Sequence, residues 1–465
     1  MAHLNCAILT FNCGREPVKP TVFARHISKY LEDTPKHDLI VFSLQEISPL
    51  SYGFIGGHCL SYYYKRFHEA LTIATGLDTY VNIFVGNIGI TAAMVYVHRD
   101  SNDRVSSIDS ASVGLGWFEM GNKGAVGVKL SWIVSSGKFV DLTFIAAHLA
   151  PHEQGLERRN QDWMHIVQRL VFQPVWTSNA RLEAFGEDDI RQHSASGTAQ
   201  DEDQPLLGRD ATSKLSRKDR TENTSTVYQP MSYTFVAGDL NYRTSNNHPR
   251  SDDYTKYPKF SNSSELIKNL LENDQLNAQR RHDKTLHGFQ EADIDFPPTY
   301  KYTSKSQKEA GETENDKVLA KHIDDSPTAL GYALHRWPSY CDRILYLAPL
   351  IEPDGRQALV KNNFYRSLPL MSTSDHQPVM ASFSIPFETL ISTTDHRIAG
   401  INDYRVEPPY AVDPLWMDRF ATARRREFIL GVLAYLGTTW EGNSILLAII
   451  VGAAGVYFTS KFGWF

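Results

Sequence analysis

The fold of this chain is constrained most by short apolar runs that recur through its first 385 residues. They are LIVFSL near Val41, AAMVYV near Val95, AVGVKLSW near Val128, LTFIAAHL near Ile145, YTFVAGDL near Val236, RILYLAP near Leu345 and PVMASFSI near Ser382. Their length and their β-branched and aromatic content predict buried strands. Helical patterns at 157–170 and 264–278 lie between some of them, so we expect an α/β fold with many strands and fewer helices.

Composition excludes several classes of protein. Of the 465 residues, 42% are hydrophobic and 22% are charged, as in an ordinary globular protein. The formal net charge of −6 disfavours a nucleic-acid binder, so any anionic ligand has to be met by a local basic pocket. The four cysteines form no CxxC pair and the N-terminus has no signal-peptide pattern, which favours the cytosol and predicts neither disulfide nor zinc site.

Polar segments divide the chain. We expect a catalytic domain at 1–386, interrupted by a disordered insertion at about 177–226 and a smaller polar insertion at about 304–325, because neither can bury enough apolar surface to order itself. Residues 387–427 have little periodicity and are predicted to be a linker.

The C-terminal region, 428–465, is apolar in two runs, of which the second contains LLAIIVGAAGVYF. This run is short for a spanning helix, which needs roughly 20 apolar residues. It carries no charge and follows Arg424, Arg425 and Arg426, so we expect a transmembrane helix with an anchor at about 444–460. A buried core helix and an amphipathic surface helix are the alternatives.

Polar side chains follow several expected strands directly, where α/β proteins place ligand groups. In FVAGDLNYR an apolar run stops at a glycine and presents Asp239, Asn241 and Arg243, although an Asp at such a point is also a common turn former. Comparable positions are held by Asn12 in TFNCG, Glu46 in LQEI, His148 in FIAAHL, Asp342 and Arg343 in PSYCDRIL, and Asp375 and His376 in MSTSDHQPV.

These motifs, with GNKGAVGV, AAHLAPHEQGLERRNQDW and FPPTYKY, stand in the order found in the inositol polyphosphate 5-phosphatases of the endonuclease/exonuclease/phosphatase superfamily, which the chain resembles. The short opening and apolar tail make it most similar to the tail-anchored members of the fungal endoplasmic reticulum. Departures from the usual pattern, which bear on substrate preference, are Ala125, Tyr340 and Thr303.

The resemblance implies a four-layer α/β sandwich of the DNase I-like type, with two packed mixed sheets flanked by helices, and hydrolysis by direct attack of water. Asp239 would accept a proton or hydrogen bond from that water, and His376, oriented by Asp342, would donate to the scissile phosphate. Whether Asp239 or the Asp342/His376 pair is the formal base stays open. The expected catalytic set is Asp239, Asn241, His376, Asp342, His148 and Asp375.

Glu46 and Asn12 are the expected ligands of Mg²⁺, which takes hard oxygen donors and keeps several waters. A basic pocket beside them would hold the phosphates of the headgroup. The residues expected to line it are Lys123, Tyr300, Lys301, Arg343 and Asn122.

The sequence thus predicts a magnesium-dependent phosphatase that removes the 5-phosphate of phosphoinositides, with phosphatidylinositol 4,5-bisphosphate as the expected substrate and no nucleic-acid partner. It would be anchored in the endoplasmic reticulum membrane with its catalytic domain in the cytosol. An abasic-site nuclease, a neutral-sphingomyelinase-like hydrolase and a non-enzymatic tether are the alternatives. The sequence carries no signal for an oligomeric state.

Overall fold

The computed structural model describes residues 3–32, 36–135, 138–175, 225–257, 263–315, 331–350, 357–387 and 403–462. Two sheets account for nearly all of its strands. The first sheet has the order β12 (Lys361–Ser367), β13 (Val379–Pro386), β1 (His3–Asn12), β2 (Leu39–Gln45), β4 (Thr91–His98) and β3 (Tyr80–Ile88). The second has the order β10 (Gln290–Glu291), β11 (Asp342–Leu347), β9 (Ser232–Asp239), β7 (Lys138–His148), β6 (Gly124–Ser135), β5 (Val105–Gly114) and β8 (Gln173–Pro174).

Each sheet contains one parallel pair of strands near its middle. β1 runs parallel to β2, and β7 runs parallel to β9, whereas the other neighbours are antiparallel. These four strands are buried on both faces, which explains why they read as continuous apolar runs rather than as alternating ones.

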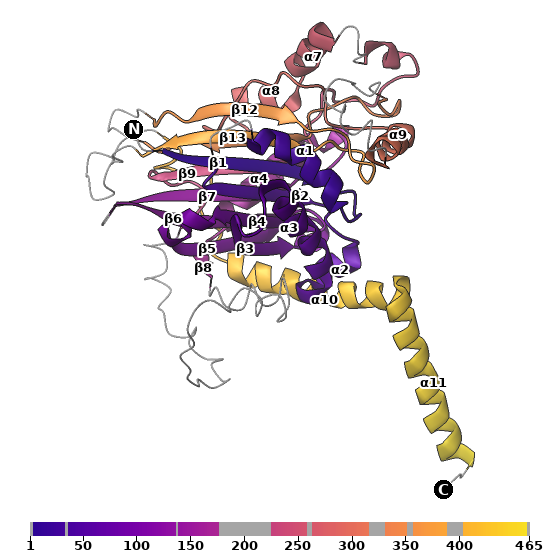
Figure 1. The fold of residues 1–465 in the computed structure, drawn as a ribbon. Coiled ribbons are helices and arrows are strands. Elements are labelled where there is room, and N and C mark those ends of the chain that lie inside the picture. The colour runs from indigo at the N-terminus through magenta and orange to yellow at the C-terminus, as the bar shows by residue number, and fades with distance from the viewer. Residues whose placement is uncertain are drawn as a thin grey trace.

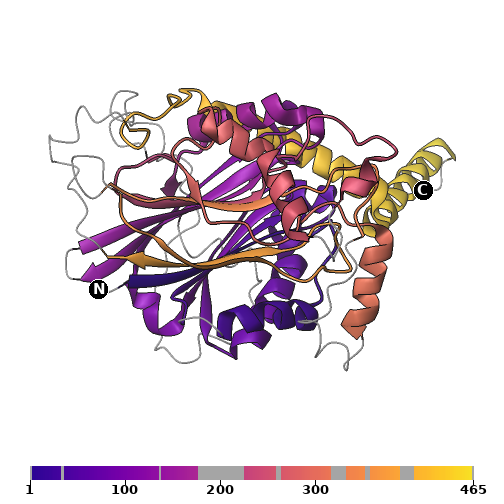
Figure 2. The ribbon, with the colours of Figure 1, turned by 90° about the horizontal axis from the view of Figure 1, so that it is seen from above.

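The two sheets pack face to face, as Figure 2 shows. Alternation of side chains along β1 explains how one strand serves two cores: Cys6 and Ile8 point between the sheets, whereas Leu9 and Phe11 point to the outside. The outer face of the first sheet is covered by α1 (Pro20–Glu32) and α3 (Ser61–Thr75), and that of the second sheet by α4 (Leu156–Arg169). The predicted four-layer α/β sandwich is confirmed.

The remaining helices are α2 (Leu50–Ile55), α7 (Ser263–Glu272), α8 (Gln275–Arg281), α9 (Ser304–Asn315), α10 (Trp416–Thr438) and α11 (Trp440–Phe462), besides short 3-10 turns such as η3 (Trp117–Glu119). The pattern at 264–278 forms two helices instead of one, because Asp274 ends the first segment and caps α8 by accepting a hydrogen bond from the Asn277 amide. The predicted insertion at 177–226 lies outside the described residues except for its last two.

Two polar stretches differ from expectation. The first half of the segment at 304–325 is the helix α9, whose Glu314 carboxylate binds the amide and hydroxyl of Ser372. Residues 416–427, expected in the linker, form the first half of α10 and pack on the body, with Ala423 and Glu427 buried.

The apolar tail leaves the body at the end of α10 and continues as the helix α11. In Figure 1, α10 runs along the lower side of the body and α11 projects away from it. Within the described part of the chain, α11 is the one helix long and apolar enough to cross a membrane, with mean hydropathy 1.7 over an 18-residue window within Trp440–Lys461. Its 23 residues correspond to about 34 Å. Only 6% of the apolar window is buried, which a core helix would not show.

Candidate active site

Strand pairing gathers the candidate residues at one edge of the sandwich. His148 and Asp342, on the strands that flank β9, both lie opposite Asp239 in the register of the second sheet. In the first sheet Asn12 ends β1, and Glu46 follows the last residue of β2. Residues more than 200 positions apart in the chain, such as Asn12 and Asp239, therefore meet.

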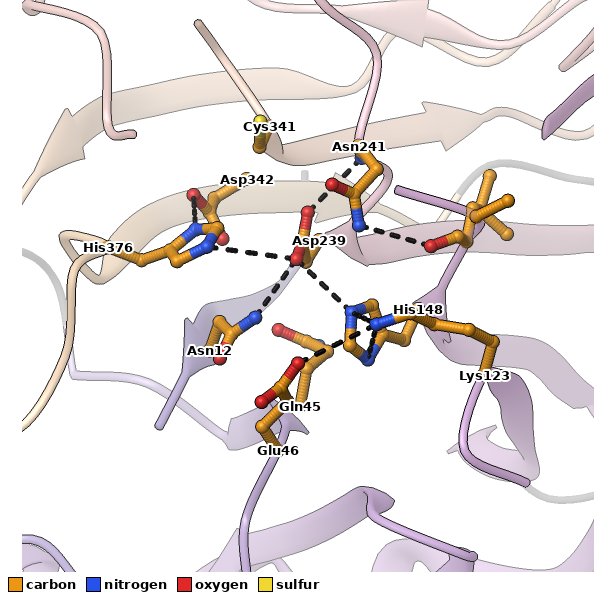
Figure 3. A network of polar contacts seen from close by, with 12 residues as sticks. Asn12, Gln45, Glu46, Lys123, His148, Asp239, Asn241, Cys341, Asp342 and His376 are labelled. Atoms are coloured by element: carbon orange, nitrogen blue, oxygen red, sulfur yellow. Dashed lines mark hydrogen bonds and ion pairs between the residues drawn. The ribbon is translucent and has the colours of Figure 1, made fainter. Parts of the chain in front are cut away.

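Asp239 is the centre of this cluster. Its Oδ2 accepts a hydrogen bond from Asn12 Nδ2 at 2.9 Å and lies 3.2 Å from His148 Nε2 and 3.9 Å from His376 Nε2. Figure 3 shows the three side chains turned toward it. Burial alone would raise the pKa of Asp239, but His376, His148 and Lys123 outweigh it and hold that pKa far below its usual range. Asp239 is thus a charged acceptor and a weak base.

His376 lies between carboxylates. Its Nδ1 is 2.9 Å from Asp342 Oδ2, and its Nε2 is 3.9 Å from both Asp239 and Asp375. Burial would lower the pKa of His376, but Asp342 and Asp239 prevail and raise it to about 9. At neutral pH the ring is therefore an imidazolium. The Tyr300 ring packs on it, with centroids 4.5 Å apart.

Asn241 is held in a defined orientation. Its backbone has a positive φ of 59°, and its amide N–H donates to Asp239 Oδ1 at 3.2 Å. Its side-chain Nδ2 donates to the Leu149 carbonyl at 3.1 Å, while its Oδ1 accepts from Arg243. Arg243, which the sequence analysis named without a role, thus fixes Asn241 and also stacks its guanidinium 4.4 Å from the centroid of the Tyr300 ring.

Glu46 pairs with two cations, Lys123 and Arg15. Its Oε1 is 3.6 Å from Lys123 Nζ, and its Oε2 accepts from Arg15 at 2.8 Å. Lys123 Nζ also lies 2.5 Å from His148 Nε2. Burial would raise the pKa of Glu46, but His148, Lys123 and Arg15 lower it, so the carboxylate stays charged.

The donors around Glu46 fit a hard divalent cation. The Glu46 side chain is 20% exposed and charged, and Asn12 turns its Nδ2 to Asp239, which leaves its amide oxygen on the Glu46 side of the cluster (Figure 3). One carboxylate, one amide oxygen and water form a suitable Mg²⁺ site.

Asp239, Asp342 and His376 also lie within 4.8 Å of one another through potential ligand atoms. A histidine binds a metal through a deprotonated ring nitrogen. Both ring nitrogens of His376 face carboxylates instead, and its pKa is about 9. This trio therefore suits a hydrogen-bonded relay better than a metal site.

A rim of polar side chains lies beside His376. Lys301, which directly follows Tyr300, pairs with Asp375, which directly precedes His376. Tyr300 and His376 themselves form an isolated antiparallel β-bridge. Arg336, which the sequence analysis missed, binds Glu153 Oε2 at 3.1 Å and approaches His152 Nδ1 at 3.3 Å. Its position just before PSYC was the available signal. The rim thus holds one of the expected cations, Lys301, with Arg336 near it.

Two expected substrate-binding residues lie elsewhere. Arg343 is fully buried, and its guanidinium binds Asp274 Oδ1 at 3.0 Å and Glu291 Oε2 at 2.6 Å. Its expected role in phosphate binding was wrong, because strand alternation turns it to the opposite face from Asp342. Asn122 turns its Oδ1 to the Trp117 amide at 3.3 Å and so shapes its own loop.

Comparison with known proteins places this site in a family. The family model described as Endonuclease/Exonuclease/phosphatase family 2 matches residues 9–382. The chain belongs to this family. The resemblance drawn from the motifs to the inositol polyphosphate 5-phosphatases is thereby supported.

The chain is 26% identical over 384 residues to phosphatidylinositol 3,4,5-trisphosphate 5-phosphatase 2A of Danio rerio, which covers 81% of this chain and 24% of that protein. It is 28% identical over 307 residues to type II inositol polyphosphate 5-phosphatase 15 of Arabidopsis thaliana, covering 63% of this chain and 23% of that protein. The chain thus spans about a quarter of the length of these curated relatives.

A solved structure shares the fold. The inositol polyphosphate 5-phosphatase domain of SpSynaptojanin, in complex with inositol (1,4)-bisphosphate and calcium ion, aligns with a TM-score of 0.53 and 19% sequence identity. The alignment covers 91% of this chain and 93% of that domain. It supports the two-sheet sandwich described above.

Proposed function

We propose that this protein is a magnesium-dependent phosphoinositide 5-phosphatase that converts phosphatidylinositol 4,5-bisphosphate to phosphatidylinositol 4-phosphate. The observation that carries the proposal is the convergence on Asp239 of an amide, Asn12, and two imidazoles, His148 and His376. The curated relatives named above, which are 5-phosphatases of inositol phosphates or phosphoinositides, support the reaction class.

In the proposed reaction, a water oxygen bonds to phosphorus while the bond between phosphorus and the C5 oxygen breaks. The inorganic phosphate keeps the OH of the water, and the departing C5 oxygen takes up a proton to become the inositol hydroxyl. Asp239 accepts a hydrogen bond from the water and Asn241 fixes its direction. A strong base is unnecessary because the transition state of phosphoryl transfer is loose.

Charge stabilisation is the main contribution of the other residues. The His376 imidazolium donates from Nε2 to a phosphate oxygen, with Asp342 holding the ring through Nδ1. His148 and Lys123 face the same phosphate from the side of Glu46. Mg²⁺ held by Glu46 and Asn12 would supply Lewis-acid stabilisation of the phosphoryl oxygens.

The rim supports recognition of a second phosphate. Tyr300 packs on His376, Lys301 pairs with Asp375, and Arg336 lies near Lys301, so a phosphate next to the scissile one on the inositol ring would meet their donors. The proposed location is the endoplasmic reticulum membrane, with α11 as the anchor and the catalytic domain in the cytosol. The arginines at 424–426 on α10 support this orientation.

The experiment that tests the proposal measures phosphate release from vesicles with phosphatidylinositol 4,5-bisphosphate, from inositol 1,4,5-trisphosphate, and strand cleavage of abasic DNA. Each arm is run with Mg²⁺ and with a chelator. We expect Mg²⁺-dependent release of the 5-phosphate and no cleavage of DNA. DNA cleavage without phosphate release would favour the nuclease of the same superfamily.

A further inference from the structure

Helix α10 lies outside the family match, which ends at residue 382, yet it packs tightly on the catalytic body. Gly431 is the point of closest approach to α2. A Cβ added there would lie 2.8 Å from Phe54 Cβ and 3.0 Å from Ile55 N. One helical turn further on, the Tyr435 ring meets the Tyr52 ring edge-on at 5.8 Å. The place of α10 on the body is thus fixed by close packing.

One buried carboxylate connects α10 to the loop that carries Lys123. The Glu427 side chain is fully buried, and its Oε1 accepts a hydrogen bond from the Gly121 amide at 2.6 Å. Its other oxygen pairs with Arg424 one turn earlier on the helix. Because Gly121 is two residues before Lys123, Glu427 acts on the backbone of the loop that carries this cation.

The same glycine is bound from its other side. Its carbonyl accepts from the Ile90 amide at 3.2 Å, and the Ile90 carbonyl accepts from the Ile47 amide at 3.2 Å. Ile47 directly follows Glu46. A chain of three backbone-directed hydrogen bonds therefore runs from Glu427 to the neighbour of Glu46.

The loop cannot adjust freely between these contacts. A Cβ at Gly121 would lie 2.6 Å from Gly89 N, and one at Gly89 would lie 2.1 Å from the Gly121 carbonyl oxygen. The Gly121 backbone is thus clamped between the turn at Gly89 and the Glu427 carboxylate. Both members of the 3.6 Å pair between Lys123 and Glu46 lie within two residues of this chain of hydrogen bonds.

We propose that Glu427 is a positioning residue of the active site, which fixes the Gly121–Lys123 loop and through it the Lys123–Glu46 pair. This inference rests on the proposed function, since it assigns a role within the same site. It makes α10 a part of the catalytic unit rather than a link to the tail. Because α11 begins directly after α10, at Trp440, the anchor helix and the active site share one structural element.

The test uses full-length protein in detergent micelles and three substitutions of Glu427. Glu427→Gln keeps an oxygen that accepts from Gly121, whereas Glu427→Ala removes it and Glu427→Asp draws it back by one methylene. Asp418→Ala is the matched control, because Asp418 is an exposed acidic residue on the same helix. The readout is kcat for phosphate release from inositol 1,4,5-trisphosphate at a temperature well below unfolding.

We expect Glu427→Ala to lower kcat by about 10-fold or more, and the Gln and Asp418 variants to stay within about 3-fold of the wild type. In a Lys123→Ala background the same Ala substitution should cost less than about 3-fold, because its effect passes through Lys123. Glu427→Asp replaces the Ala variant if the latter does not fold. The proposal would be overturned if the fold-reductions in kcat of Glu427→Ala and Lys123→Ala multiplied in the double variant, or if Glu427→Ala had normal turnover.

A readout independent of activity separates this inference from the proposed function. Amide hydrogen exchange of the peptide 117–123 should be faster in Glu427→Ala than in the wild type, with no change in β12. An inactive wild-type enzyme with this exchange difference would refute the proposed function alone. Unchanged exchange in the loop would refute the clamp, whatever the activity.

Discussion

Replacement of Asp342 by asparagine tests the charge state assigned to His376. The substitution keeps an oxygen for His376 Nδ1 to bond but removes the carboxylate 2.9 Å away, the nearest of the three that raise the pKa of His376 from 6.5 to about 9. Asp239 and Asp375, both at 3.9 Å, remain. An opposite charge this close shifts a pKa by roughly 1 to 3. We therefore expect the pKa of His376 to fall to about 7.

The consequence is a change in the alkaline side of the pH profile. The wild-type imidazolium persists until the pH rises through about 9, so activity that needs it is retained at pH 8 and falls above pH 9. In Asp342→Asn the fall begins about two pH units lower. The ratio of wild-type to variant activity should then grow from its value at pH 6 by about 100-fold above pH 9.

The assay is Mg²⁺-dependent phosphate release from inositol 1,4,5-trisphosphate between pH 6 and pH 10. Lys123 needs a control because burial lowers its pKa, so its deprotonation could also end activity at high pH. Lys123→Arg, which stays protonated throughout, should leave the alkaline limb in place. A folded Asp342→Asn enzyme whose limb coincides with that of the wild type would refute the imidazolium assignment.

Five further results are expected. Asp239→Ala should lower turnover by at least about 10²-fold with an unchanged circular-dichroism spectrum, and near-normal turnover would contradict its role at the water. Lys301→Ala should raise KM more for 4,5-bisphosphorylated than for 5-monophosphorylated headgroups, and equal effects on both headgroups would argue against the rim. Arg343→Ala should destabilise the fold by about 3–5 kcal/mol in urea unfolding, because it takes the buried cation from Asp274 and Glu291. A chain ending at Thr439, which keeps α10, should stay active on inositol 1,4,5-trisphosphate and should no longer resist carbonate extraction from membranes. Deletion of 178–222 should leave activity within a few-fold of that of the full chain.

The structure moves the point at which the chain can be shortened without loss of activity. The linker expected at 387–427 implies that a chain ending at Thr422 would keep its catalytic activity. Such a chain lacks Glu427 and Gly431, which bind the loop before Lys123 and pack on α2. We therefore expect it to lose most of its turnover, in contrast to the chain that ends at Thr439.

The sequence by itself determined the class of fold, the residues at the centre of the site and seven of the strands, namely β2, β4, β6, β7, β9, β11 and β13. It could do so because strands buried on both faces read as continuous apolar runs, and because polar residues such as Asp239 and His148 directly follow such runs. Parallel pairing of β7 with β9 puts both strand ends at the same edge of the sheet, and the register of the pair places the two residues opposite each other.

Only the tertiary structure decided which cations face the site. Lys301 and Arg343 stand in equally suggestive motifs, but the pleat turns Arg343 into the body, where two carboxylates offset the cost of burying its charge. Glu427 had no local signal, because its partner is a backbone amide 306 residues earlier in the chain. Contacts of this kind arise when separate elements pack together, and no periodicity along one segment records them.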